Sequence, residues 1–219
     1  MTHRLPSHLL FAAIGGSMLA LTAMSAPSAP RAHAPALRTM AVDTAVFAGG
    51  CFWGVEGVFE HVKGVISATS GYAGGSVASP SYEEVSSGTT GHAESVRVVF
   101  DPSRVRYADL LQVFFLVAHD PTELDRQGPD IGTQYRSLVL YRNAAQKEAA
   151  EAYVAELGRT KVYERPIVTR IEPLQAFYPA EAYHQHYMAL HPDQPYIYYN
   201  DAPKLVQLRQ RFPTWYRES

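Results

Sequence analysis

A strand-to-helix junction around the only cysteine of the chain, Cys51, constrains this sequence more than any other feature. An apolar run at residues 45–48 and a Gly-Gly pair precede the cysteine, and apolar residues recur at helical spacing over residues 55–62. The thiol is therefore predicted at the first turn of a helix, where unpaired backbone N–H groups and the helix dipole favour a thiolate. Phe52 and Trp53 follow directly and predict an apolar pocket beside the sulfur.

A buried structural role is the alternative for Cys51, since free cysteine is among the most buried residue types. The Gly-Gly junction favours a nucleophile over that alternative. Because the chain contains no second cysteine, no disulfide can form within it. In an oxidising compartment an unpaired thiol is a liability unless it is buried or used. If the protein is exported, as its N-terminal segment predicts, the single cysteine is more readily explained as a reactive thiol.

Composition is that of an ordinary globular protein, and the length of 219 residues fits one domain with a substantial core. Hydrophobic residues make up 47% of the chain and charged residues 18%. The formal net charge of -2 argues against a nucleic acid or an acidic membrane surface as partner. His-rich tracts and metal-type cysteine spacing are absent from the sequence, so we expect neither a metal ion nor a cofactor.

The N-terminal segment has the layout of a secretory signal peptide. His3 and Arg4 form a short basic region, and residues 9–24 form an uncharged apolar run followed by small residues. We expect residues 1–36 to be a signal peptide and flexible leader, and residues 41–219 to be the catalytic domain. The protein is then periplasmic or secreted, without stable membrane insertion after cleavage; an uncleaved membrane anchor is the alternative.

Strand-like runs and amphipathic helical runs alternate along the rest of the chain. The expected strands are residues 44–48, 65–72, 94–100, 137–141 and 167–171. The expected helices are residues 53–62, 81–86, 107–118 and 143–157, the last ended by Gly158, with shorter ones near 180–190 and 203–212. This pattern predicts an α+β fold, a two-layer α/β sandwich with a mixed, mostly antiparallel sheet and a long irregular C-terminal segment.

Several segments, in order, resemble those of the peptide methionine sulfoxide reductase A family. Gly-Cys-Phe-Trp-Gly at residues 50–54 is similar to the active-site segment of that family. The further similar segments are residues 71–75, 80–85, 90–96, 119–122, 130–137 and 180–185. Their order and spacing agree over about residues 45–187, which is far more specific than any one segment. The resemblance implies reduction of the S epimer of methionine sulfoxide, in peptides and free, to methionine.

The resemblance also assigns roles to residues that the pattern alone leaves open. Cys51 would attack the sulfoxide sulfur and become a sulfenic acid. A glutamate on a strand usually faces solvent, but the resemblance makes Glu94 the proton donor, with its pKa raised by an apolar pocket. Tyr82 and Tyr135 would donate hydrogen bonds to the sulfoxide oxygen, and Asp130 would support the polar part of the site.

The aromatic pair beside the cysteine would bind the other end of the substrate. Phe52 and Trp53 are expected to hold the S-methyl group, since aromatic rings suit contact with sulfur and methyl. His184 and His186 are expected to have structural or rim roles, because the reaction already has a nucleophile and an acid.

Recycling of the sulfenic acid must use a thiol from outside the chain, because relatives that resolve it internally use further cysteines. A small thiol, a thioredoxin-like or glutaredoxin-like protein, or a periplasmic reductase domain could serve. The expected partners are therefore this donor, oxidised proteins or peptides, and free methionine sulfoxide, and the protein is expected to be a monomer.

Two other functions remain open from the sequence. A cysteine hydrolase or acyl transferase would pair Cys51 with His184 or His186 and a third orienting group. A non-enzymatic binding module would grip methionine-rich segments through Phe52 and Trp53. The group nearest the sulfur decides between the enzymes: a carboxyl with tyrosines indicates the reductase, and an imidazole indicates the hydrolase.

Overall fold

The computed structural model describes residues 41–218 of the chain. The predicted signal peptide and leader, residues 1–36, lie outside the described residues. Within residues 41–218, no helix is long and apolar enough to cross a membrane.

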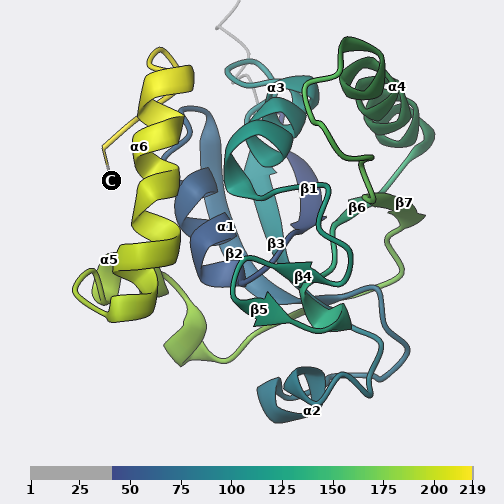
Figure 1. Ribbon diagram of the computed structural model, residues 1–219, viewed down its shortest axis with the longest axis vertical. Coiled ribbons are helices and arrows are strands. Elements are labelled where there is room, and N and C mark those ends of the chain that lie inside the picture. Colours follow the sequence, from purple (N-terminus) through teal and green to yellow (C-terminus); the bar gives the residue numbers. More distant parts are fainter. Residues whose placement is uncertain (1–40, 219) are drawn as a thin grey trace, which may run out of the picture. The chain divides into compact units, whose positions relative to one another are not determined.

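A six-stranded sheet forms the centre of the fold, in the order β7-β6-β1-β3-β2-β8 (Figure 1). Its strands are β1 (Asp43–Ala48), β2 (Val65–Ala73), β3 (Ala93–Phe100), β6 (Leu138–Tyr141), β7 (Arg170–Pro173) and β8 (Phe177–Pro179). Neighbouring strands are antiparallel except for the parallel pair of β6 and β7, so the prediction of a mixed, mostly antiparallel sheet is confirmed. A separate hairpin pairs β4 (Arg126–Gln127) with β5 (Asp130–Ile131).

Helices cover one face of this sheet. Figure 1 shows α1 over the sheet between α6 and α3, with α4 beside β6. The α-helices are α1 (Phe52–Glu60), α2 (Tyr82–Ser86), α3 (Tyr107–Val113), α4 (Ala144–Thr160), α5 (Tyr187–Leu190) and α6 (Ala202–Arg211). Shorter turns are the π-helices η1 (Phe114–Ala118) and η4 (Ile197–Asp201) and the 3-10 helices η2 (Thr133–Tyr135) and η3 (Ala182–His184).

The side chains of β1 contribute to two apolar clusters, one on each face of the sheet, because successive side chains of a strand point to opposite faces. Ala45 and Phe47 join the main core under the helices, whereas Val46 and Ala48 join a smaller cluster on the other face. Phe47 stacks on Phe59 of α1 at a ring-centroid distance of 5.3 Å. Burial of these apolar side chains is the main force that holds α1 on the sheet.

The bend between β1 and α1 requires both of its glycines. Gly50 has a φ of +88°, which residues with a side chain rarely adopt. A Cβ on Gly50 would lie 2.5 Å from Cγ of Gln127, and one on Gly49 would lie 2.7 Å from Cγ of His119. The bend therefore delivers Cys51, at the N-cap position of α1, to a packed environment.

Two predicted helices have different bounds in the structure. The helix expected over 107–118 loses its α-helical geometry at Phe114 and continues as a π-turn, whose carbonyl at Phe114 contacts the ring of His119. The helix expected to end at Gly158 runs on to Thr160, because Gly158 keeps helical geometry. Lys161 closes it instead with a φ of +53°.

Two further segments also differ from the prediction. The strand expected from residue 167 begins at Arg170, because the N–H of Val168 bonds to the carbonyl of Pro121 and not to β6. The helix expected near 180–190 is divided into η3 and α5 by His186, which has a φ of +55°.

The packing of α1 against the C-terminal segment predicts that alanine in place of Gly54 destabilises the protein. A Cβ at Gly54 would lie 2.0 Å from Oδ1 of Asp201, so Gly54→Ala is expected to lower the free energy of unfolding by about 1–3 kcal/mol. Gly158→Ala is the matched control, because its added Cβ would meet no atom of the described residues within 4 Å outside its own helical turn, and it is expected to stabilise by about 0.5–1 kcal/mol. Urea unfolding measures both, and equal stabilisation by the two changes would contradict this packing.

Candidate active site

A small cavity at the start of α1 brings the predicted site residues together. It has a volume of about 180 Å³. The residues that line it are Cys51, Phe52, Trp53, Tyr82, Glu94, Asp130, Tyr135 and Tyr196. Seven of these eight are the residues predicted from the sequence, and they come from α1, α2, β3, β5 and η2. Segments that are far apart in the chain thus converge on one sulfur.

The thiol of Cys51 is buried, with only 8% of the residue exposed. Burial raises its pKa well above the ordinary value, and the nearby carboxyls of Glu94 and Asp201 raise it further. The backbone N–H of Trp53 and the ammonium group of Lys204 lower the pKa of Cys51, but by less than burial and the carboxyls raise it. The expectation of a thiolate is therefore wrong for the substrate-free protein, because desolvation outweighs the helix N-terminus.

Glu94 lies at the beginning of β3, with 3% of the residue exposed. Its Oε2 accepts a hydrogen bond of 3.0 Å from the N–H of Phe52. Burial raises the pKa of Glu94 to about 8, a rise that the Phe52 N–H opposes and the carboxyl of Asp130 reinforces. The carboxyl is therefore mainly protonated at neutral pH and carries a proton that it can donate.

The two predicted tyrosines keep their hydroxyl protons. Burial raises the pKa of Tyr82 and, more strongly, the pKa of Tyr135. The N–H of Tyr82 bonds to Glu181 at 3.0 Å, and the carbonyl of Tyr135 accepts a bond of 3.2 Å from the N–H of Gly50. These backbone contacts tie both phenols to neighbouring elements, and the second connects Tyr135 to the bend that carries the cysteine.

Sequence reasoning missed Tyr196 as a residue of the cavity. Its hydroxyl donates a hydrogen bond to Oδ2 of Asp130. Burial raises the pKa of Asp130, and the Tyr196 bond opposes this rise. Tyr196 follows a proline in an aromatic segment without periodicity, and with 14 tyrosines in the chain its sequence offered no distinguishing signal.

A buried ion pair behind the cavity was also missed. Nζ of Lys204 lies 2.9 Å from Oδ1 of Asp201, whose side chain is 1% exposed. Asp201 raises the pKa of Cys51, of Glu94 and of Asp130, whereas Lys204 lowers that of Cys51. An Asp and a Lys three residues apart are typical of an exposed helix, so this spacing did not indicate an internal pair.

Imidazole groups do not line this cavity among the residues that the structure describes. His184 lies behind the aromatic wall, where its Nδ1 accepts a hydrogen bond of 3.1 Å from the indole N–H of Trp53. His186 instead bonds to Glu60 and Glu56 of α1. The groups that share the cavity with Cys51 are a carboxyl and phenols, which argues against the hydrolase alternative.

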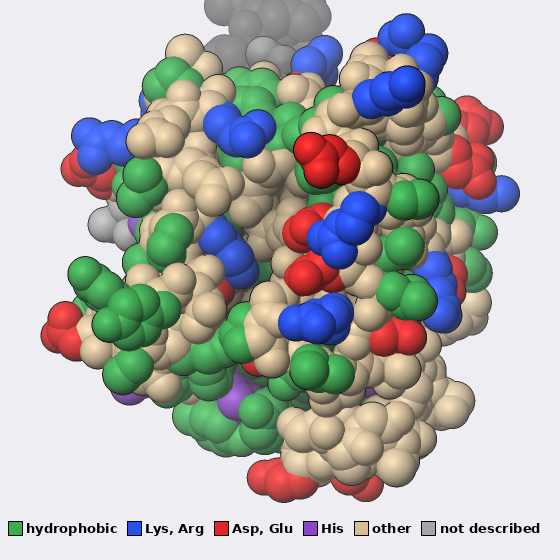
Figure 2. Space-filling model, in the orientation of Figure 1, with side chains coloured by type: hydrophobic (Ala, Val, Ile, Leu, Met, Phe, Trp, Pro, Cys, Tyr) green, Lys and Arg blue, Asp and Glu red, His purple; other side chains and the backbone are tan. Residues whose placement is uncertain are grey.

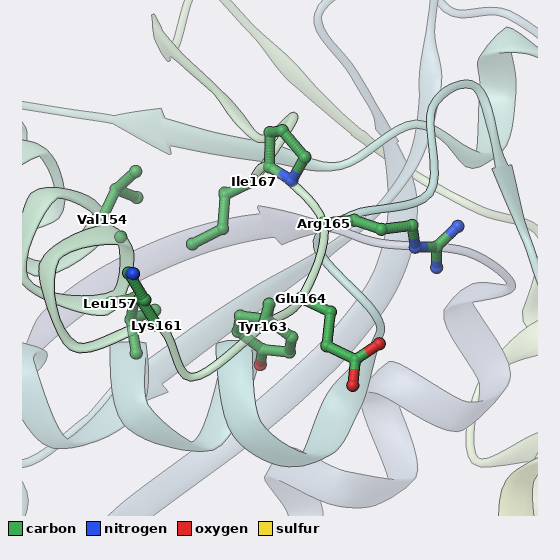
Figure 3. Close-up of a pocket in the computed structure, with 9 residues that line it drawn as sticks. Val154, Leu157, Lys161, Tyr163, Glu164, Arg165 and Ile167 are labelled. Atoms are coloured by element: carbon green, nitrogen blue, oxygen red, sulfur yellow. The ribbon is translucent and has the colours of Figure 1, made fainter.

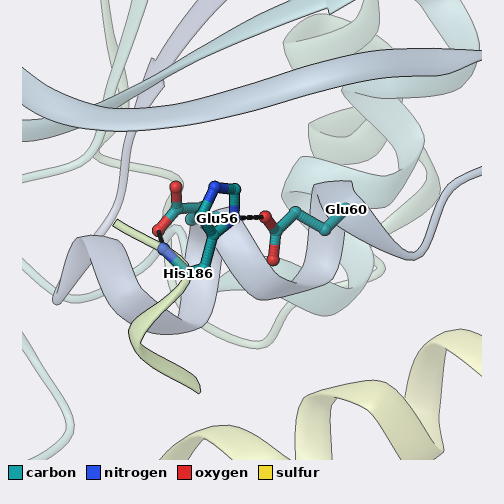
Figure 4. Close-up of side chains that lie close together, drawn as sticks. All are labelled: Glu56, Glu60 and His186. Carbon is teal, nitrogen blue, oxygen red and sulfur yellow. Dashed lines mark hydrogen bonds and ion pairs between the residues drawn. The ribbon is translucent and has the colours of Figure 1, made fainter. Parts of the chain in front are cut away.

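His186 belongs to a polar cluster with Glu56 and Glu60 of α1 (Figure 4). Its ring bonds to Glu60, and its backbone N–H donates to Oε2 of Glu56 at 3.1 Å. Oε2 also accepts the hydroxyl of Ser70 at 3.0 Å, and burial raises the pKa of Glu56 to about 7. The cluster fastens the start of α5 to α1.

A larger hollow lies away from the cysteine. It has a volume of about 750 Å³, between the end of α4 and residues 161–167 (Figure 3). Figure 3 shows side chains of mixed character around it, including Lys161, Glu164 and Arg165, and no residue of the cysteine cavity. Figure 2 shows acidic and basic side chains interspersed on the face in view. Volume and charge therefore do not identify the site; the convergence on Cys51 does.

The arrangement is that of a thiol enzyme, in which one buried sulfur, two carboxyls and three phenols share a cavity with the rings of Phe52 and Trp53. Residues 43–215 match the family model of peptide methionine sulfoxide reductase, and the chain belongs to this family. The enzyme class predicted from the sequence is thereby confirmed.

Individual relatives agree with this assignment. Peptide methionine sulfoxide reductase MsrA 2 of Mesorhizobium japonicum is 57% identical over 176 residues, which are 80% of this chain and 90% of the relative. Peptide methionine sulfoxide reductase MsrA of Thermus thermophilus is 50% identical over 178 residues, 81% of this chain and 99% of the relative.

Solved structures show the same fold. Mxr1 from Saccharomyces cerevisiae in its reduced form has a TM-score of 0.64 at 34% identity, covering 70% of this chain and 87% of its own. Methionine sulfoxide reductase A of Corynebacterium diphtheriae has a TM-score of 0.61 at 36% identity, covering 69% of this chain and 76% of its own. These likenesses confirm the α+β class predicted from the sequence.

Proposed function

We propose that this protein reduces the S epimer of methionine sulfoxide, peptide-bound and free, to methionine, with Cys51 as the nucleophile. The observation that carries the proposal is the cavity in which the Cys51 thiol meets the protonated carboxyl of Glu94 beside aromatic rings. Family membership supports the same reaction.

Binding would use opposite sides of the cavity for the two ends of the sulfoxide group. The S-methyl group packs against Phe52 and Trp53, since thioether and methyl groups make favourable contacts with aromatic rings. The oxygen points to the donors Glu94, Tyr82 and Tyr135. Chirality at sulfur is read because the methyl wall and the oxygen donors hold fixed relative positions.

The chemical step balances without a proton from outside. Glu94 protonates the sulfoxide oxygen while the Cys51 sulfur attacks the substrate sulfur, and the thiol proton replaces the proton that Glu94 gave. The S–O bond and the bond formed between the two sulfurs then both break as the hydroxyl transfers to the Cys51 sulfur, which becomes a sulfenic acid. The substrate sulfur gains the electron pair that the Cys51 sulfur loses, and methionine leaves.

The raised pKa of Cys51 suits this order of events. In the empty cavity, burial and neighbouring carboxyls keep the sulfur protonated. Protonation of the sulfoxide oxygen places positive charge on the substrate sulfur. This charge stabilises a thiolate at Cys51, for which the empty cavity supplies no full counter-charge. Deprotonation of Cys51 is thus coupled to the presence of substrate.

The activity itself is tested with the two separated epimers of a methionine sulfoxide peptide and dithiothreitol as thiol donor. We expect turnover of the S epimer only, and its abolition in Cys51→Ser with an unchanged circular dichroism spectrum. Reduction of neither epimer by folded protein with a titratable thiol would overturn the proposal, and turnover by the serine variant would exclude Cys51 as nucleophile.

The pH dependence follows from Glu94. A proton donor acts below its pKa, so the single-turnover rate of prereduced enzyme is expected to fall as the pH rises through about 8. Glu94→Gln removes the transferable proton and is expected to slow the reaction by about 10²–10⁴ and to abolish this fall. Rapid quench without added thiol measures methionine formation directly. A wild-type rate that rises through this range would instead indicate control by Cys51 deprotonation.

We further propose that the protein acts in the periplasm or outside the cell, with a dedicated thioredoxin-like donor there. The signal-peptide pattern of residues 1–36 and the lack of a second cysteine in the chain support this. A donor thiol attacks the sulfenic acid and releases water, and a second donor thiol cleaves the mixed disulfide to restore Cys51.

Fractionation of cells that produce the full chain is expected to yield a shortened protein outside the cytoplasm. Retention of the full-length chain in the membrane fraction would favour the anchor alternative, and full-length cytoplasmic protein would contradict export. Turnover with a thioredoxin-like protein is expected to exceed turnover with glutathione at physiological concentration; an equal rate with glutathione alone would contradict a dedicated donor.

A further inference from the structure

His184 lies directly behind the aromatic wall of the cavity, with 2% of the residue exposed. Its Nδ1 accepts the indole N–H of Trp53 at 3.1 Å. An indole N–H can only donate, so Nδ1 must be without a proton and the neutral ring must carry its proton on Nε2. Burial lowers the pKa of His184, which keeps this neutral form.

The other nitrogen of the ring shows that packing alone does not explain this histidine. Nε2 of His184 is buried and has no hydrogen-bond partner among residues 41–218. Leaving a buried donor unpaired is unfavourable, and a phenylalanine would fill the same space without that penalty. The polar function of His184 therefore lies in the bond to Trp53.

This bond adds a directional restraint to the ring contacts of Trp53, which include an edge contact with Tyr196 at a centroid distance of 6.0 Å. The indole stacks face to face on Tyr187, with ring centroids 3.8 Å apart and an angle of 10° between the planes. Stacking fixes the plane of a ring but allows it to slide and turn within that plane. A directional hydrogen bond at the indole N–H opposes this motion, because turning the ring would lengthen or bend the bond.

The ring of His184 also contacts both the proposed methyl wall and the oxygen-donor side of the cavity. Its centroid lies 5.0 Å from that of Phe52 and 4.5 Å from that of Tyr82. His184 thus touches both rings of the proposed methyl wall and one proposed oxygen donor. It is placed to hold the distance between the two halves of the site.

We propose that His184 is a positioning residue for substrate binding, which holds the Trp53 indole through Nδ1 and so shapes the wall that receives the S-methyl group. The inference rests on the proposed function, in which this wall binds the sulfoxide substrate. His184 touches no reacting atom in this role; it acts through Trp53.

Two substitutions separate the hydrogen bond from the packing. His184→Phe keeps a ring against Tyr82 but removes the acceptor, and we expect KM for the S epimer to rise about tenfold with little change in kcat, as for lost uniform binding. In His184→Asn the side-chain oxygen can take the place of Nδ1, and we expect KM to return most of the way to the wild-type value. Tyr183→Phe is the control, because it keeps the ring that packs on His184 at 4.1 Å.

Equal KM values in wild type and His184→Phe would overturn the proposal. So would an asparagine variant that binds no better than the phenylalanine variant, since a purely structural role would favour the ring. Circular dichroism and urea unfolding confirm that each variant is folded before its kinetics are compared.

A spectroscopic measurement tests the bond without any turnover. In ¹⁵N spectra, His184 is expected to show a bare Nδ1 and a protonated Nε2, assigned by the signal lost in His184→Asn. The Trp53 indole N–H, observed in a Trp215→Phe background, is expected to shift in His184→Phe. A protonated Nδ1 or an unmoved indole signal would refute the inference. Failure of the wild type to reduce the S epimer would instead refute the proposed function and leave these signals intact.

Discussion

The tight bend at Gly49 and Gly50 is the constraint on which the rest of the site depends. His119 and Gln127 pack where side chains at these two positions would lie, so the bend that precedes α1 excludes side chains. The start of α1 after this bend places the N–H of Phe52 on Glu94 at 3.0 Å and the sulfur of Cys51 beside the same carboxyl. Two close packing contacts between distant segments thereby help to set the geometry of nucleophile and acid together.

Burial of several acidic groups around one sulfur determines the protonation of the site. Glu94, Asp130 and Asp201 lie close enough to raise one another's pKa or that of Cys51, and Lys204 is the cation that opposes them. Desolvation is the largest cause for each acid, because a charge buried without a full partner is unfavourable. The result is a site in which burial favours the protonated forms of Cys51 and Glu94.

Much of the candidate site could be predicted from the sequence, because its chemistry-bearing residues stand in short segments of recognisable order. Cys51, Glu94 and Tyr82 line one cavity as that order implies. Tyr196 could not be predicted, since its segment has no period and is rich in equivalent aromatic residues. The Asp201–Lys204 pair was equally hidden, because its spacing is that of a solvent-exposed helix face.

By itself the sequence determined the strand, bend and helix that carry Cys51, the α+β class and the family, because local spacing and ordered motifs suffice for these. Only the tertiary structure decided that burial raises the pKa of the Cys51 thiol, that Tyr196 bonds to Asp130, and that Trp53 bonds to His184. Desolvation and contacts between residues as far apart as 131 positions depend on distances in space, which no local pattern contains.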